Sequence, residues 1–233
     1  SIAACHARAL APEQTDWVKR QSLGGFLRDV TIAAVILGAG LWLYRGSVEK
    51  GKQLRALGQE AKVLMTKDSP DAYARAEEKL QAMLSLDEGH AFAISTLAEL
   101  YAVRSMDHGL EADAPKAREW TKRAGGLDAP INERFGAVVL GLLGEGKFAE
   151  AEQYANEITQ KAASSHAVNG LGLALRGQGK LEEAKHVLKK AADSEWRNPR
   201  FACDVAEVYF EDGDFANAQA FYGKGVESNS EHL

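Results

Sequence analysis

The sequence predicts an all-α protein in which a single transmembrane helix precedes a solenoid of about five helix pairs. Two passages near the C-terminus, Gly179–Ala184 and Gly213–Ala218, superpose with a shift of 34 residues. A repeat of this length, with a glycine-containing turn between two helical patterns, is typical of solenoids. The transmembrane helix is predicted by residues 30–44, a run of 15 residues without a charge.

Residues 1–22 are small and polar and are expected to form a loose segment or a short interfacial helix. Cys5 follows Ile2-Ala3-Ala4 as in a lipoprotein cleavage box, but the apolar segment that such a box requires before the cysteine is missing. Zinc needs about four ligands at set spacings, and nothing near Cys5 and His6 completes such a set. Cys5 and Cys203 lie on opposite sides of the apolar run, so no disulfide is predicted.

Residues 23–46 are interpreted as the anchor. The uncharged run would make a helix of about 22 Å, which is shorter than the roughly 30 Å hydrocarbon core of a bilayer. Arg28 and Arg45 can extend the span, because long basic side chains reach toward the headgroups. Trp42 and Tyr44 suit the interface. A buried helix of a soluble protein and a cleaved signal peptide are the alternatives.

The orientation of the anchor depends on the basic residues on its two sides. The residues concerned are Lys19, Arg20 and Arg28 before the run and Arg45, Lys50, Lys52 and Arg55 after it. This count is almost balanced, so the positive-inside rule decides little. A single early anchor behind a basic patch usually leaves its N-terminus inside. We therefore expect the repeats in the periplasm, on the outer face of a bacterial inner membrane.

Charge limits the class of partner. The formal net charge is −5, and the part after residue 45 is more acidic than the whole, because residues 1–45 have an excess of basic side chains. Phosphate binding needs clustered Lys and Arg. The repeat region has no basic stripe, so nucleic acid is not an expected partner.

Residues 47–233 are interpreted as the repeat domain, with units near 57–90, 91–131, 132–164, 165–198 and 199–232. Leu54, Leu57, Ala61 and Leu64 recur at helical spacing, so the first helix is expected to continue from the anchor. The second unit has a surplus of about seven residues around 105–115. This surplus predicts either longer helices or a projecting loop.

Small residues recur where two helices would approach closely, and large residues recur beside them. The small residues are Ala98, Gly172 and Ala206 in the first helices and Ala76, Ala117, Ala151, Ala184 and Ala218 in the second. The large ones are Tyr101, Leu142, Leu175 and Tyr209 in the first helices and Tyr73, Phe148, Leu181 and Phe215 in the second. With the 34-residue period, this pattern resembles the tetratricopeptide-repeat family.

The resemblance implies a right-handed superhelix whose first helices line a concave groove. The positions that face this groove in the family are, in this chain, Phe92, Ser95, Glu99, Ala102, Leu140, Leu143, His166, Asn169, Leu173, Arg176, Arg200, Cys203, Glu207 and Phe210. Such a mixture suits an extended peptide or a partner helix. The Lys/Asn clamp with which some family members hold a C-terminal carboxylate is not built. The alternative is that the concave face is only solvated and that the protein binds its partner through another surface.

No motif predicts catalysis or a cofactor. The sequence has no GxGxxG and no P-loop, and its six histidines are scattered. Asp107, His108, Glu111 and Asp113 do not have the spacing of a calcium loop. Cys203 falls at a concave position, where packing is expected rather than nucleophilic chemistry. We expect no enzyme, no metal and no cofactor.

The sequence therefore favours a non-enzymatic, membrane-anchored scaffold for protein–protein interaction. We expect a structural or accessory subunit of a bacterial envelope complex, for secretion, motility, division or translocation. Its partners would be other proteins in the groove, the lipid bilayer around residues 30–44, and membrane subunits packed on the anchor. The alternatives are a folding or assembly factor that binds clients transiently and a regulatory subunit of an enzyme carried on another chain.

Overall fold

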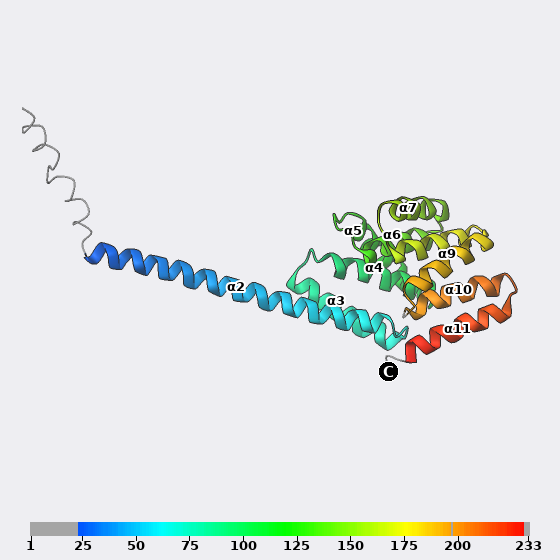
Figure 1. Ribbon diagram of the computed structural model, residues 1–233, viewed down its shortest axis with the longest axis horizontal. Coiled ribbons are helices and arrows are strands. Elements are labelled where there is room, and N and C mark those ends of the chain that lie inside the picture. The colour runs from blue at the N-terminus through cyan, green and yellow to red at the C-terminus, as the bar shows by residue number, and fades with distance from the viewer. Residues whose placement is uncertain (1–22, 197, 231–233) are drawn as a thin grey trace, which may run out of the picture. The chain divides into compact units, whose positions relative to one another are not determined.

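The computed structural model describes residues 23–196 and 198–230. The expectations for residues 1–22, including the lipoprotein and zinc hypotheses and the basic residues Lys19 and Arg20, lie outside this part. The described part contains helices and no strands, and its helices form successive pairs (Figure 1). The prediction of an all-α solenoid of helix pairs is confirmed.

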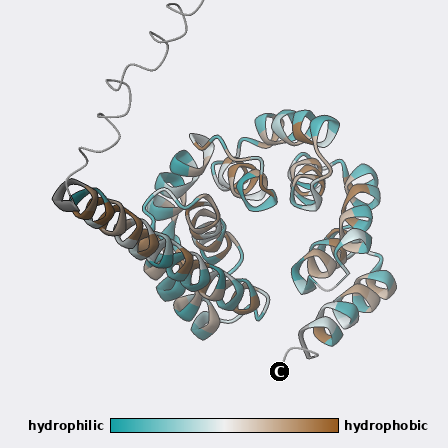
Figure 2. Ribbon diagram, turned by 60° about the vertical axis from the view of Figure 1, so that its left-hand side comes forward, coloured by the Kyte–Doolittle hydropathy of each residue, from teal (hydrophilic) through white to brown (hydrophobic). Residues whose placement is uncertain are grey.

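Helix α2, Leu23–Met65, is 43 residues long and includes the predicted anchor. Its apolar side chains are exposed from Phe26 to Tyr44, and Trp42 is 75% exposed. Among the described residues, it is the one helix long and apolar enough to cross a membrane. Figure 2 shows this apolar stretch in brown. The chain divides into two compact units between Lys52 and Gln53, so the last turns of α2 belong to the solenoid.

The remaining helices follow in chain order. They are α3 (Pro70–Leu86), α4 (Ala91–Met106), the short 3₁₀ helix η3 (Glu111–Asp113), α5 (Ala114–Gly125), α6 (Asn132–Gly144), α7 (Phe148–Lys161), α8 (Ser165–Gly177), α9 (Leu181–Ser194), α10 (Pro199–Glu211) and α11 (Phe215–Ser230). The last turns of α2 pair with α3, because Lys79 Nζ lies 2.6 Å from Glu60 Oε2.

Local sequence sets where these helices begin and turn. The Ser69 hydroxyl accepts a hydrogen bond from the amide of Ala72 at 3.3 Å, directly before Pro70 at the first position of α3. Such caps satisfy amides that have no partner inside the helix. Gly146, Gly179 and Gly213 have φ of 72°, 75° and 78°. Glycine adopts this left-handed conformation without steric cost, so three pairs share one kind of turn.

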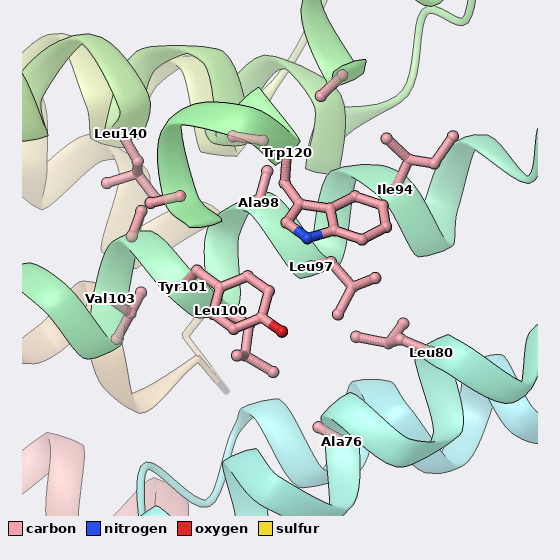
Figure 3. Close-up of a cluster of buried hydrophobic side chains, with 14 of the residues drawn as sticks. Ala76, Leu80, Ile94, Leu97, Ala98, Leu100, Tyr101, Val103, Trp120 and Leu140 are labelled. Atoms are coloured by element: carbon pink, nitrogen blue, oxygen red, sulfur yellow. The ribbon is translucent and has the colours of Figure 1, made fainter. Parts of the chain in front are cut away.

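The core of the first pairs is a layer of large side chains between alanines (Figure 3). Leu80 of α3, Leu97 of α4 and Trp120 of α5 point toward one another, and all three are at most 9% exposed. The alanines at the close approaches, from Ala76 in α3 to Ala218 in α11, are buried as predicted. The small residues expected at the close approaches are therefore in place from the first pair to the last.

The first helices of successive pairs pack side by side, α4 on α6, α6 on α8 and α8 on α10. Figure 2 shows the pairs of the solenoid following an arc. A Cβ atom at Gly170 would lie 2.5 Å from Val139 Cγ1 of the preceding pair, and one at Gly172 would lie 2.4 Å from Leu188 Cγ of its own pair. These two glycines therefore set how closely the helices approach.

The surplus of the second unit lengthens one helix and adds a loop. Helix α4 has 16 residues, against 13 in α6, α8 and α10, whereas α5 has 12. The segment between them folds onto the first two pairs. Arg104 Nε lies 2.8 Å from Asp113 Oδ2, and His108 Nε2 lies 3.0 Å from Asp68 Oδ1. The loop is therefore tied to the solenoid at both of its ends.

Phe215 differs from the expectation drawn from its position in the repeat. That position predicts a side chain that fills space beside a close approach, as Tyr73 does, but Phe215 is 63% exposed. Its ring meets the exposed ring of Phe210 edge to face, with 5.4 Å between centroids. At the equivalent position of the third pair, Phe148 lies against Gly177 of the following helix α8, and no described helix follows α11.

Candidate functional site: the concave groove

Two hollows lie along the inner side of the arc, and both are lined by the first helices of successive pairs. The first has a volume of about 650 Å³ and the second about 210 Å³. The first is lined by Gln59, Lys62, Val63, Met65, Thr66, Tyr73, Phe92, Thr96, Glu99, Glu133, His166, Ser194, Glu195, Trp196, Asn198 and Arg200. The second is lined by Met106, Asp107, Leu140, Leu143, Phe148, Leu173, Arg176, Gly177, Arg200, Asp204, Glu207 and Glu211.

Arg200 of α10 lines both hollows. Its Nη1 donates a hydrogen bond of 3.1 Å to Glu99 Oε1 of α4, and its Nη2 lies 3.7 Å from Asp107 Oδ2. Burial disfavours the charge, but the carboxylates of Asp204, Asp107 and Glu99 hold the pKa of Arg200 above its ordinary value. Arg200 therefore stays charged and joins the fifth pair to the second across the groove.

Glu99 lies between Arg200 and His166. Its Oε2 is 4.0 Å from His166 Nδ1, and the two side chains are only 13% and 15% exposed. The His166 ring meets the Phe201 ring edge to face at 5.6 Å. A Cβ atom at Gly136 would lie 2.9 Å from His166 Nδ1, so glycine at that position leaves room for the imidazole. Four helices thus position one largely covered carboxylate.

Asp204 is a second acidic group in the groove wall, where it lines the second hollow. It is 8% exposed, and its Oδ2 accepts a hydrogen bond of 2.8 Å from Asn169 Nδ2. Burial raises the pKa of Asp204 to about 6, although the charge of Arg200 and the Asn169 hydrogen bond act in the opposite direction. A buried carboxylate without a directly paired cation favours its neutral form. The charge of this wall therefore depends on pH.

The second hollow combines an apolar wall with a bridging cation. Leu140 and Leu143 are buried at its floor. Arg176 of α8 reaches α10, with Nη1 at 2.5 Å from Glu207 Oε2 and Nη2 at 2.6 Å from Glu211 Oε1. Both acceptors are in the next pair, so this ion pair also stabilises the stacking of α8 on α10.

The comparisons with known proteins agree with this architecture. A family model described as a tetratricopeptide repeat matches residues 165–195, which include α8 and all of α9. A solved structure of a thermophilic tetratricopeptide-repeat protein, TTC0263 of Thermus thermophilus, aligns with a TM-score of 0.57. It is 19% identical and covers 77% of this chain and 91% of that one. Residues 165–195 thus match a tetratricopeptide repeat, and the chain shares the fold of a tetratricopeptide-repeat protein.

Two further solved structures align with this chain at lower TM-scores. PilF of Pseudomonas aeruginosa aligns with a TM-score of 0.49 and 18% identity, covering 77% of this chain and 78% of that one. PilW, a type IV pilus biogenesis factor, aligns with a TM-score of 0.48 and 19% identity, covering 76% and 79%. No curated protein matches the chain in sequence.

The groove residues expected from the tetratricopeptide pattern fall into three groups. Phe92, Glu99, His166 and Arg200 line the first hollow, and Leu140, Leu143, Leu173, Arg176, Arg200 and Glu207 line the second. Ser95 and Asn169 are buried in the wall. Phe210 is exposed beside Phe215, away from both hollows. The structure therefore brings most of these residues to the groove and leaves Phe210 outside it.

Cys203 does not have the environment of a nucleophile. It is half-buried, and a Cβ atom at Gly225 would lie 3.0 Å from its Sγ, so it packs between α10 and α11. Burial raises the pKa of Cys203 to about 11, with smaller contributions from Asp204 and other acids. The reactive form of cysteine is the thiolate, and this thiol stays protonated.

Several lining residues lie outside the set expected from the sequence. The end of α2 contributes four of them, from Gln59 to Met65, and Thr66 follows directly after the helix. The repeat register is weak in this first unit, although Met65 occupies one of its groove positions. Glu133 holds the second position of its unit, so the rule applied to its neighbours would have found it. Trp196 comes from the turn between pairs, where the repeat pattern makes no prediction.

Proposed function

We propose that this protein is a non-enzymatic scaffold that holds a segment of another protein in its concave groove. The observation that carries the proposal is the 650 Å³ hollow on the inner helices. It combines apolar side chains such as Phe92 with a fixed polar cluster at Glu99, His166 and Arg200. Recognition sites for extended peptides and helices commonly combine apolar pockets with a few placed polar groups. The protonated thiol of Cys203 is consistent with a role other than catalysis.

In this proposal, residues 23–46 anchor the protein in a membrane and residues 47–233 form the repeat domain. The exposed apolar side chains of α2 support the anchor. Lipid around these side chains would remove them from water, which is favourable for apolar groups. The anchor of the full chain should stay in the membrane in alkaline carbonate, whereas a peripheral protein is released.

We further propose that the protein is a structural or accessory subunit of a bacterial envelope complex, with its repeats in the periplasm. A single cysteine at the exposed position Asp193, in a variant with Ser at positions 5 and 203, tests the sidedness. A membrane-impermeant maleimide should label this cysteine in intact spheroplasts. Labelling that requires lysis would place the repeats in the cytoplasm.

The groove is tested by capture of partners from gently solubilised membranes. The baits are the full chain, a version that starts at Gly46, and the full chain with Glu133→Arg, which places a long side chain in the first hollow. Glu183→Arg is the matched control, because Glu183 is exposed on α9 outside both hollows. We expect Glu133→Arg to lose stoichiometric partners that the other three baits retain.

Two results would contradict the groove assignment. Equal capture by Glu133→Arg and Glu183→Arg would show that partners dock elsewhere on the repeats. Loss of all partners from the version that starts at Gly46 would show that the anchor, with the segment before it, is the docking element. Binding of a partner in the groove predicts neither of these results.

A further inference from the structure

We infer that the segment bound in this groove is cationic, with a Lys or Arg side chain next to a bulky apolar residue. The inference rests on the proposed function, because it specifies the partner of the same groove. It is carried by the charge and composition of the two hollows and by the ion pairs that already occupy the groove's two arginines.

The groove is more acidic than the chain as a whole. The acidic side chains that line the two hollows are Glu99, Asp107, Glu133, Glu195, Asp204, Glu207 and Glu211. The basic ones are Lys62, Arg176 and Arg200. Clefts lined by one sign of charge concentrate the field of that charge and attract ligands of the opposite sign. Carboxylates outnumber cations by more than two to one, so the groove attracts a positively charged segment.

The two arginines of the groove are not available to an acidic ligand. Arg200 is paired with Glu99 and Asp107, and Arg176 is paired with Glu207 and Glu211. Each arginine therefore already has two carboxylates near it. A ligand carboxylate at either place would be the third negative charge around one guanidinium, which is unfavourable at close range.

Several carboxylates, in contrast, keep capacity for a cation. Glu133 has no ion pair among the described residues. Asp107 is exposed, and its Oδ2 is 3.7 Å from Arg200 Nη2, beyond hydrogen-bond distance. Glu99 is held by Arg200 through one oxygen, and its other oxygen is 4.0 Å from His166. Ionised carboxylates accept several hydrogen bonds each, so these three can bind further donors.

Arg200 itself shows how the groove holds a cation. Its guanidinium lies between carboxylates of α4 and of the loop that follows α4, although it is contributed by α10. Glu133 lines the same hollow as Arg200, and its carboxylate can accept a partner's Arg or Lys there. Val63, Phe92 and Trp196 line the same hollow. Such side chains favour an aliphatic or aromatic residue beside the cation.

The test uses the full chain in detergent and three short fluorescent peptides with one Trp at the centre. The first peptide has Lys on both sides of the Trp, the second has Gln at these positions and the third has Glu. Fluorescence anisotropy should give the Lys peptide at least about tenfold higher affinity than the Gln peptide. No binding of the Glu peptide is expected. The preference should shrink between about 50 mM and about 300 mM salt, because salt screens partly exposed charges.

Variants locate the binding. Glu133→Gln and Asp107→Asn each remove one groove charge with little change in shape, and each should weaken the Lys peptide severalfold. Glu183→Gln removes the same charge from α9 and should leave the affinity unchanged. Circular dichroism of the three variants should match the parent protein, which excludes loss of folding as the cause.

Four outcomes overturn the inference in distinguishable ways. Tighter binding of the Glu peptide, or equal binding of the Gln and Lys peptides, contradicts a cationic partner and leaves the groove as a binding site. Equal weakening by Glu183→Gln shows attraction to the acidic protein as a whole. Failure of all three peptides contradicts the inference, whereas the proposed function then still stands or falls on the capture of partners by Glu133→Arg.

Discussion

The second and the fifth helix pairs each bury one carboxylate, and they treat it differently. Asp113 of the second pair is 5% exposed, with Arg104 Nε at 2.8 Å and Lys116 Nζ at 3.7 Å. Asp204 of the fifth pair is 8% exposed and has an amide, Asn169, as its hydrogen-bond partner. The second pair, which contains the extra loop, neutralises its buried carboxylate with two cations. The fifth pair, which follows the repeat pattern, leaves its buried carboxylate beside the groove without a directly paired cation.

The two regions also differ in what determines their packing. The fourth and fifth pairs follow the repeat pattern, and helices approach at small residues such as Gly172. The second pair contains the extra loop and relies on a polar network. Tyr101 Oη donates a hydrogen bond of 2.7 Å to Glu77, and Arg104 bonds the same carboxylate at 3.0 Å. We therefore expect the fourth and fifth pairs, the regular region, to lose stability when a side chain is enlarged. We expect the second pair, the irregular region, to lose stability when a charged side chain is removed.

The largest effect is expected from added volume in the regular region. Gly172→Val should lower the free energy of unfolding by about 3 kcal/mol, because overpacking of a close approach strains side chains and backbone. The added Cβ would lie 3.2 Å from the backbone nitrogen of Leu188 as well as against its side chain. Urea denaturation measures the change.

Gly223→Val is the matched control for this substitution. Gly223 lies in α11, and a Cβ atom there would meet no atom within 4 Å. Valine has a higher helix propensity than glycine, so propensity alone predicts no loss for either variant. If both variants lose the same stability, the close approach at Gly172 does not limit the packing.

A smaller loss is expected from removal of the paired charge in the irregular region. Asp113→Ala should lower the free energy of unfolding by about 2 kcal/mol, because removing one partner of a buried ion pair leaves the other without compensation. The effect is moderated because Arg104 keeps Glu77. Asp193→Ala, on the exposed face of α9, should change stability little, and an equal loss there would contradict a structural role for the pair.

In contrast to Asp113, removing the charge of the buried Asp204 in the fifth pair is expected to raise the free energy of unfolding. Because the pKa of Asp204 is raised to about 6 by burial, the folded protein binds this proton more tightly than the unfolded chain. The free energy of unfolding therefore falls as pH rises through this range. Asp204→Asn should remove that loss and raise stability by about 1 kcal/mol at neutral pH.

The gain should disappear below about pH 4, because Asp204 is then protonated in both states. Thermal unfolding of the parent and variant at several pH values measures it. A variant that is destabilised at neutral pH would show that the attraction between Asp204 and Arg200 outweighs the cost of burial.

The smallest effect is expected from the hydroxyl in the polar network. Tyr101→Phe removes one hydrogen bond to Glu77 but leaves Arg104 on the same carboxylate. A loss of about 0.5–1 kcal/mol is expected for one partly buried hydrogen bond. Tyr209→Phe provides the comparison in the regular region, where the ring stacks on Phe221. A larger loss there than at Tyr101 would contradict the contrast between the two regions.

Much of the fold could be predicted from the sequence because the same local rule repeats. The alanines of the second helices, the glycine turns and the large residues beside them each appear at fixed positions, and their burial follows from helix geometry. Phe215 is the exception, because its exposure depends on whether a following helix covers it. The segment 107–113 could be located as a surplus, but its contacts with Asp68 and Arg200 could not be read from its length.

The candidate groove was predicted less completely. The repeat pattern predicted that Glu99, His166 and Arg200 lie on the inner helices. It did not show that the Glu99 carboxylate lies close to both of the other two side chains. Trp196 and the end of α2 were missed, since a turn and a degenerate unit carry no repeat signal. Side chains that are far apart in sequence meet only when the curvature of the array is known.

The sequence by itself determined the helix pairs, their turns and the small residues that let them stack, because each of these depends on contacts within about one repeat. The tertiary structure alone decided the curvature of the array of helix pairs. This curvature brings Arg200 to Glu99, from which it is separated by 101 positions in the sequence. It also decided that carboxylates gather on the inner face. Curvature sums small rotations from every repeat, so no single stretch of sequence encodes the groove.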